Sequence, residues 1–200
     1  MRRRKYAEKS ELIWSRCTTG QREVHIVTKD GALYGVFPES GEASDMVAVC
    51  RRWYSNCKLI TGPVPIAIEQ ELSAYFAGDT AKLRVTIPAE AGTDFQRRIW
   101  TLLRKIPRGK VWSYSRLAAE AGCPTAARAV GAAVGANPLS IYLPCHRVVG
   151  ASGAMTGYAW GLEWKRHLLM LEGVTVTALG HQLSVPHRFF DGIDSFRGVG

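Results

Sequence analysis

The segment Pro144-Cys145-His146-Arg147-Val148-Val149 places a thiol next to an imidazole, between an apolar run at 139–143 and the glycine-rich residues 150–153. The thiolate is the reactive form of cysteine, and a neighbouring imidazole or a helix N-terminus lowers the thiol pKa. Adjacent side chains rarely point the same way, so we expect His146 to act through a water or a backbone turn. Two interpretations remain open from these residues alone, a reactive Cys145 and a buried structural cysteine.

The elements around this segment are expected to be mainly helical. Thr93 and Gln96 have capping-box spacing, which predicts a helix from 93 to 106 that Pro107 stops. Ser113 is expected to cap a helix over 114–121, and Thr125 a helix running to 134. Two short capped helices joined by a glycine-containing turn predict a helix-turn-helix. The last predicted elements are an extended run at 141–143, a loop at 153–161 and a helix at 162–171.

The helix after Thr125 is built almost entirely from alanine and glycine, with Arg128 as its one charged residue. Such a surface lets a backbone come close to whatever faces it. Tight packing against another helix is one interpretation. The other is a helix lying against a DNA groove, with Arg128 reaching inward.

The N-terminal part is predicted to be α/β. The β-rich runs 23–28 and 32–37, separated by a glycine-containing turn, indicate a hairpin at which the sheet begins. Helices are expected at 45–53 and 65–76, and a strand at 83–87. This part shows no catalytic constellation, so we interpret His25, Cys50 and Cys57 as structural residues.

Composition divides the chain into a basic N-terminal tail (1–9), an α/β domain (10–88), a linker (89–92), a second domain (93–173) and a loosely docked C-terminal tail (174–200). The net charge of +9 is uneven, because residues 93–173 carry eleven basic and four acidic side chains. A basic domain favours a polyanionic partner, with nucleic acid the first candidate; a solvated basic face is the alternative.

The 200-residue chain is long enough for a folded core, with 46% hydrophobic residues. It contains no apolar run of membrane-spanning length and no signal-peptide pattern. Its five cysteines form no CxxC pair, so neither a disulfide framework nor a zinc site is indicated. We therefore expect an intracellular protein, cytoplasmic or nuclear, without metal, cofactor, membrane association or an obligate protein partner.

The combined motifs resemble those of the O6-alkylguanine-DNA alkyltransferases, also called methylated-DNA–protein-cysteine methyltransferases. The matching residues are Thr93-Asp94-Phe95-Gln96, Val111-Trp112-Ser113-Tyr114, Ala127-Arg128-Ala129-Val130-Gly131, Asn137-Pro138, Pro144 to Val149, Gly157-Tyr158 and Leu171-Glu172-Gly173. The resemblance is strong over 93–173 and limited to size and order of elements before that. It implies a ribonuclease H-like N-terminal domain and a mostly α, winged-helix-like C-terminal domain.

The resemblance also implies a reaction. Cys145 would accept the alkyl group from O6 of guanine, chiefly O6-methylguanine, flipped out of duplex DNA, and would do so irreversibly and once. His146 would take the thiol proton through a water, and Glu172 would orient that imidazole. Tyr114 would help rotate the nucleotide and donate a proton at N3, and Asn137 would brace the turn that carries the cysteine.

The remaining roles concern DNA and the base pocket. Arg128 would fill the place of the flipped base. The other implied DNA-binding residues are Tyr114, Thr125, Ala126, Ala127 and Gly131. The implied pocket residues are Val148, Tyr158, Ala159 and Trp160.

The chain departs from many vertebrate members, which carry serine and glycine where Ala159 and Trp160 stand here. We therefore expect a narrower pocket that prefers methyl to bulky alkyl groups. Two other classes stay open: a non-reactive lesion-binding protein of the same fold, in which another residue commonly replaces the cysteine, and an unrelated thiol hydrolase. The presence of Cys145 favours transfer over lesion binding, and the hydrolase leaves Arg128 unexplained.

Overall fold

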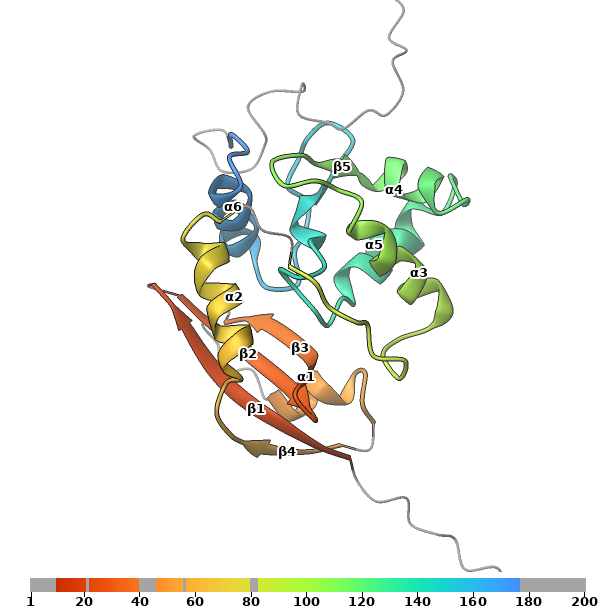
Figure 1. The fold of residues 1–200 in the computed structure, drawn as a ribbon. Helices are drawn as coiled ribbons and strands as arrows, with labels where there is room; N and C mark the ends of the chain where they lie inside the picture. Colours follow the sequence, from red (N-terminus) through yellow and green to blue (C-terminus); the bar gives the residue numbers. More distant parts are fainter. Residues whose placement is uncertain (1–9, 21, 40–45, 56, 80–82, 177–200) are drawn as a thin grey trace, which may run out of the picture.

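The computed structural model describes residues 10–20, 22–39, 46–55, 57–79 and 83–176, with the side chains of 46–47 left aside (Figure 1). The predicted N-terminal tail (1–9) and most of the predicted C-terminal tail (174–200) lie outside these residues. The described end of the latter is docked, because Val174 is buried. Within the described residues, no helix has both the length and the apolar character needed to cross a membrane.

The N-terminal half is built on a four-stranded sheet in the order β3-β2-β1-β4. Its strands are β1 (Ser10–Thr19), β2 (Arg22–Lys29), β3 (Ala32–Pro38) and β4 (Cys57–Thr61). The predicted β2–β3 hairpin is confirmed, and its turn places Asp30 and Gly31 at positive φ. The expectation that the sheet begins at this hairpin is wrong. β1 pairs antiparallel with β2 and parallel with β4, and neither β1 nor β4 was expected.

Two helices accompany this sheet. α1 (Met46–Arg51) and α2 (Ile66–Phe76) lie within the two predicted helical segments, and α2 crosses the sheet against β1 (Figure 1). The strand predicted at 83–87 is wrong, since this segment pairs with no strand among the described residues. The free edge of β3 is occupied instead by the 138–140 segment: the Val36 amide donates to Pro138 O (2.8 Å) and the Ser140 amide to Val36 O (3.1 Å).

The C-terminal half contains the predicted helix-turn-helix as α4 (Tyr114–Glu120) and α5 (Ala127–Gly135), which pack together beside α3 (Asp94–Leu103). The capping box of α3 and the Ser113 cap of α4 are confirmed. The Thr125 cap is wrong. Ala126 occupies the N-cap position of α5, and its amide closes a turn onto Cys123 O instead (2.9 Å).

The segment leading to the cysteine is a tight turn, so the extended run predicted at 141–143 is wrong. The Leu143 amide donates to Leu139 O (2.8 Å), and Ile141 adopts φ 74°, which is rare for a β-branched residue. A short 3-10 helix, η1 (Cys145–Arg147), follows, and then β6 (Val148–Val149) pairs in parallel with β5 (Trp112–Ser113). The predicted final helix is confirmed as α6 (Leu162–Leu171).

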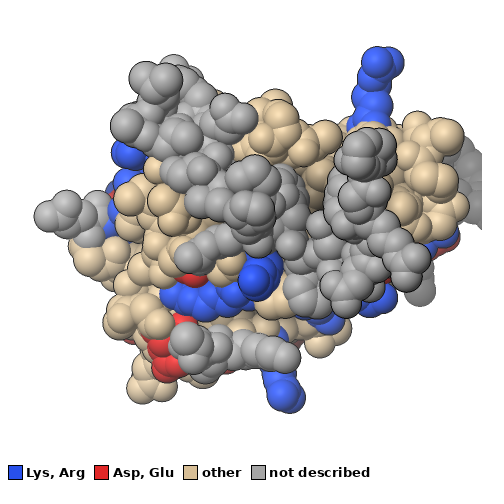
Figure 2. Space-filling view, turned by 90° about the horizontal axis from the view of Figure 1, so that it is seen from above, with Lys and Arg blue, Asp and Glu red and all other residues tan. Residues whose placement is uncertain are grey.

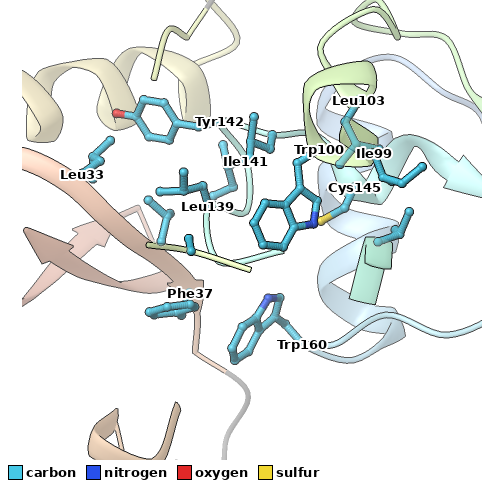
Figure 3. Packing of buried hydrophobic residues seen from close by; sticks show 14 of the residues in the cluster. Leu33, Phe37, Ile99, Trp100, Leu103, Leu139, Ile141, Tyr142, Cys145 and Trp160 are labelled. Atoms are coloured by element: carbon cyan, nitrogen blue, oxygen red, sulfur yellow. The ribbon is translucent and has the colours of Figure 1, made fainter. Parts of the chain in front are cut away.

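One cluster of buried side chains runs through both halves (Figure 3). The Phe37 ring of β3 lies 5.3 Å from that of Trp160, and the Trp100 indole donates to Ala133 O (2.7 Å) within the same cluster. At the predicted linker, Ala91 is fully buried and the Arg97 guanidinium binds the carbonyls of 89, 91 and 92. The halves share a core, and the division at 89–92 stays a prediction.

The capping box of α3 generates a stability prediction. Thr93→Ala removes the hydroxyl that accepts from the Gln96 amide (3.2 Å), so we expect the free energy of unfolding to fall by about 1 kcal/mol. Urea denaturation followed by circular dichroism measures it. Thr101→Ala, an exposed change inside the same helix, should alter stability by less than about 0.5 kcal/mol. Equal losses in both variants would contradict a special role for the cap.

Candidate active site at Cys145

Cys145 is the first residue of η1, and its thiol is held by the side chain of Asn137. The Asn137 amide group donates to Leu143 O (2.8 Å) and to Cys145 Sγ (3.1 Å), while its oxygen accepts from the Leu139 amide (3.0 Å). One buried amide therefore bonds both ends of the tight turn and the thiol at once. This contact requires α5 to end at the asparagine, which the following proline ensures.

The thiol lies in a setting that opposes ionisation at rest. Burial raises the pKa of Cys145, and contacts with Asn137, Ser140 and Tyr158, together with the nearby Lys165 ammonium, offset this increase only in part. The pKa remains above its ordinary value, so the thiol is protonated at neutral pH. Thiolate has to be formed by moving a proton when a reaction partner arrives.

The imidazole of His146 and the carboxylate of Glu172 form a buried pair behind the thiol. His146 Nε2 lies 3.0 Å from Glu172 Oε1, and both side chains are fully inaccessible to solvent. Burial lowers the pKa of His146 and outweighs the opposing effect of Glu172, so the ring is neutral at pH 7. Its Nδ1 is buried without a hydrogen-bond partner among the described residues. No hydrogen bond of the described residues joins this ring to Cys145 Sγ.

Two further donors fix the carboxylate. Arg147 donates from Nε to Glu172 Oε2 (2.7 Å) and from Nη2 to Oε1 (2.8 Å), and the Tyr75 hydroxyl donates to Oε1 (2.7 Å). Burial alone would raise the pKa of Glu172, but His146 and Arg147 hold it well below its usual range. The carboxylate therefore stays ionised and orients the imidazole.

A cavity of about 180 Å³ opens onto the thiol. Its lining residues are Tyr114, Gly131, Val134, Gly135, Asn137, Cys145, Gly157, Tyr158, Ala159 and Trp160. It thus brings together residues from α4, α5, η1 and the loop before α6. Val148, predicted for the pocket, lies outside this lining and is buried in β6 opposite Trp112.

The predicted DNA-contacting residues divide between this cavity and the outer surface. Tyr114 lies in the lining, and its hydroxyl donates to Thr156 O (3.3 Å); Gly131 also faces the ring of Tyr114. Arg128 and Thr125 are exposed at the start of α5, with Ala126 and Ala127 half-buried between them. The same helix, α5, therefore lines the cavity and carries the exposed arginine.

Trp160 forms one wall of the cavity from within the core. Its indole donates to Ser140 Oγ (2.9 Å), and its ring packs at 5.3 Å from Phe37 (Figure 3). Ser140 Oγ lies 4.0 Å from Cys145 Sγ. The Ser140 hydroxyl therefore connects Trp160, which forms the cavity wall, to the thiol. Trp160 in turn packs against β3 through Phe37.

Lys165, on α6, is a residue that sequence reasoning missed. Its side chain is buried, its ammonium donates to Gly157 O (3.2 Å), and it makes no ion pair among the described residues. Burial lowers its pKa to about 8, with the Cys145 sulfur acting in the opposite direction. Tyr75 and Ser140 were also missed. A lysine flanked by Trp164 and Leu168 on an amphipathic helix is the one signal that was available in the sequence.

Comparison with known proteins identifies relatives of this chain. The model of the family described as 6-O-methylguanine DNA methyltransferase, DNA binding domain, matches residues 94–174. The methylated-DNA–protein-cysteine methyltransferase of Mycolicibacterium paratuberculosis is 46% identical over 120 residues, which are 60% of this chain and 69% of that protein. The chain belongs to the methylated-DNA–protein-cysteine methyltransferase family. The resemblance read from the motifs is thereby confirmed.

Further relatives of this methyltransferase family member extend the match. The Salmonella typhimurium methylated-DNA–protein-cysteine methyltransferase is 52% identical over 109 residues, 54% of this chain, and the match spans 64% of that relative's length. The crystal structure of Mycobacterium tuberculosis O6-methylguanine methyltransferase has a TM-score of 0.67 at 35% identity, covering 80% of this chain and 92% of that one. Mycobacterium tuberculosis OGT in complex with DNA gives 0.66 at 34% identity, with the same coverage. The α/β architecture is therefore that of the family.

Among the described residues of this family member, no three His, Cys, Asp or Glu side chains gather in an arrangement that could hold a metal ion.

The buried ammonium of Lys165 generates a prediction with a pH signature. Below pH about 8 the ammonium is charged and favours the Cys145 thiolate. Lys165→Met should slow alkylation of Cys145 by iodoacetamide roughly tenfold at pH 7, which corresponds to about one pKa unit of lost stabilisation. The difference from the wild type should narrow above pH 8, where the wild-type lysine loses its charge. Peptide mapping by mass spectrometry separates Cys145 from the other cysteines.

Lys110→Met, at an exposed lysine, is the matched control for this change and should leave the profile unaltered. Circular dichroism verifies that both variants are folded. An unchanged rate in folded Lys165→Met at pH 7 would contradict an electrostatic role for this lysine.

Proposed function

We propose that this protein repairs DNA by direct reversal, transferring the alkyl group of O6-alkylguanine irreversibly to Cys145. The observation that carries the proposal is the thiol at the base of a cavity, held by Asn137 and backed by the neutral His146 and ionised Glu172. A nucleophile, a base and an orienting carboxylate are the groups such a displacement needs. The names of the family's relatives support the same reaction.

The proposed steps balance as follows. The Cys145 proton passes through a water to His146 Nδ1, the nitrogen that has no partner among the described residues. The thiolate attacks the alkyl carbon, an S–C bond forms, and the C–O bond breaks with its electron pair passing to the guanine. Tyr114 donates a proton at N3 of the leaving base, and the phenolate regains a proton from water as the His146 imidazolium releases its own. Burial raises the pKa of Tyr114, which keeps this phenol protonated at neutral pH.

We expect the thioether product to have no route back, because breaking its S–C bond would require the sulfur to act as a poor leaving group. Each molecule therefore acts once. A base that reaches the cavity from duplex DNA has to leave the stack, since the thiol is buried. The partner we propose is double-stranded DNA carrying O6-alkylguanine, encountered in the cytoplasm or the nucleus.

The helix-turn-helix is the proposed DNA-facing element. Arg128 stands exposed on α5, whose inner side lines the cavity through Gly131 and Val134. An arginine in this position would occupy the space that the flipped base leaves. The match to Mycobacterium tuberculosis OGT in complex with DNA supports DNA as the partner. We retain the ribonuclease H-like and winged-helix-like assignments of the two halves as part of the proposal.

The proposal predicts a mass change on one residue. Incubation with a short duplex containing one O6-methylguanine should add a single methyl group to Cys145, restore guanine and stop after one turnover. Intact-protein mass spectrometry with peptide mapping measures this result. Cys145→Ser should bind the same duplex without gaining mass.

Two outcomes would overturn this assignment in different ways. Tight binding of the lesion by the wild type without a mass change would favour a non-reactive lesion-binding protein. Several turnovers on an ester substrate would favour a thiol hydrolase. Arg128→Ala should lower the rate with the methylated duplex at least tenfold while leaving iodoacetamide labelling of Cys145 unchanged, which separates DNA engagement from thiol chemistry.

The cavity also predicts the range of alkyl groups. The buried Trp160 indole lines the cavity of about 180 Å³ beside the thiol, so we expect methyl to transfer much faster than benzyl. Free O6-benzylguanine should inactivate the wild type at least tenfold more slowly than Trp160→Gly, as measured by residual methyl transfer. Trp164→Gly, which removes a tryptophan outside the cavity, is the control. Rapid inactivation of the wild type would contradict the narrow-pocket hypothesis.

A further inference from the structure

A second cavity, of about 640 Å³, borders the segment that carries Cys145 without sharing a lining residue with the thiol cavity. It lies between the end of α2, the extended segment 83–86, the residues that follow α3, and the 141–147 segment. Figure 1 shows the chain after α2 running between the two halves of the molecule at this position. A volume of this size is typical of small-molecule sites.

The charge of its lining is of one sign. The described lining residues include five cations, Arg84, Arg104, Lys105, Arg108 and Arg147, and no aspartate or glutamate. Glu172 balances only Arg147. Figure 2 shows lysine and arginine side chains at the surface on the face seen from above, with a few acidic side chains beside them. Such a concentration of uncompensated positive charge attracts an anion.

Some of these cations already donate hydrogen bonds to backbone carbonyls, and others do not. Arg108 donates to the carbonyls of Asp79 and Leu171 (both 3.0 Å), and Arg104 donates to Val85 O. These neutral acceptors orient the guanidinium groups without cancelling their charge. Arg84 and Lys105 are exposed and make no side-chain hydrogen bond or ion pair among the described residues, so their donors are available to a ligand.

The rest of the lining is suited to a nonpolar body. Leu83 and Val85, which are half-buried, and the exposed Pro107 contribute apolar surface, and the buried rings of Tyr75 and Tyr142 lie behind it. An inorganic anion alone would leave this surface uncovered. A ligand with a flat or apolar body attached to an anionic group would use both parts of the cavity.

We propose that this cavity binds a small organic phosphate of mononucleotide size, with the phosphate against Arg84 and Lys105 and the body against Leu83, Val85 and Pro107. The site borders the catalytic groups, because its wall residues Tyr75 and Arg147 both bind Glu172. The proposal rests on this cavity alone and does not depend on the alkyl transfer proposed for Cys145.

The test is calorimetric titration of the full chain with adenosine 5′-monophosphate at low salt. Binding is expected, and it should weaken at least tenfold in the double variant Arg84→Gln/Lys105→Gln, because each charge-assisted hydrogen bond contributes about that factor or more. Arg52→Gln/Lys110→Gln removes two exposed cations outside the lining and should bind like the wild type. Adenosine and inorganic phosphate, each carrying half of the ligand, should both bind at least tenfold more weakly.

Three results would overturn the proposal: no binding of the nucleotide at millimolar concentration, equal weakening by both double variants, or a loss in Arg128→Gln with none in the cavity variant. The last result would place the nucleotide on the helix-turn-helix surface. Urea denaturation of each variant verifies that lost binding does not reflect lost folding.

Discussion

The buried amide of Asn137 is the interaction on which the geometry of this molecule depends. It bonds Leu143 O, the Leu139 amide and the Cys145 sulfur, so the tight turn and the nucleophile share one brace. The brace is useful only if the turn itself is held. The N-terminal sheet supplies this support, because Val36 of β3 exchanges hydrogen bonds with Pro138 and Ser140. The indoles of Trp53 and Trp100 bind carbonyls near the C-terminal end of α5, at Ala136 (2.8 Å) and Ala133 (2.7 Å). The N-terminal half thus positions a site to which it contributes no nucleophile.

The second constraint is the cost of burying Glu172. An isolated carboxylate in a protein interior is strongly unfavourable, and it persists only when charged and polar donors surround it. Three donors come from two elements: His146 and Arg147 from η1, and Tyr75 from α2. This convergence keeps the carboxylate ionised, while burial keeps the neighbouring imidazole neutral. A neutral imidazole can receive a proton, whereas an imidazolium cannot, so the burial of His146 leaves it in the form that the proposed base needs.

Local signals in the sequence predicted the local parts of this structure. Each of three confirmed predictions depends on residues that are close together in the sequence. They are the Thr93–Gln96 capping box, the turn at Asp30-Gly31 and the helix α6. Two local predictions failed, the Thr125 cap and the extended run at 141–143. The other failures involve partners far apart in the chain. The 83–87 segment has a strand-like composition, but β3 pairs with 138–140 in its place. The Tyr75 hydroxyl donates a hydrogen bond to Glu172, which lies 97 residues later in the sequence. No sequence pattern near either residue predicts that contact. Cys145, His146, Glu172 and Asn137 were predicted through the family resemblance. The roles of Tyr75 and Arg147 as donors to Glu172 were not.

The state of the thiol connects these constraints to the proposed chemistry. A nucleophile that is used once gains nothing from high intrinsic reactivity, because any passing electrophile would consume the molecule. Burial raises the pKa of Cys145 and keeps it protonated, while Asn137 and Lys165 favour the thiolate without reversing that effect. Reactivity therefore requires an event that moves the proton toward His146, and a base filling the cavity would exclude solvent and bring the alkyl carbon to the sulfur at the same moment. The narrow cavity beside Trp160 makes that event selective. The protonated resting state of Cys145 and the small cavity beside it therefore have the same effect: both restrict the thiol to one kind of substrate.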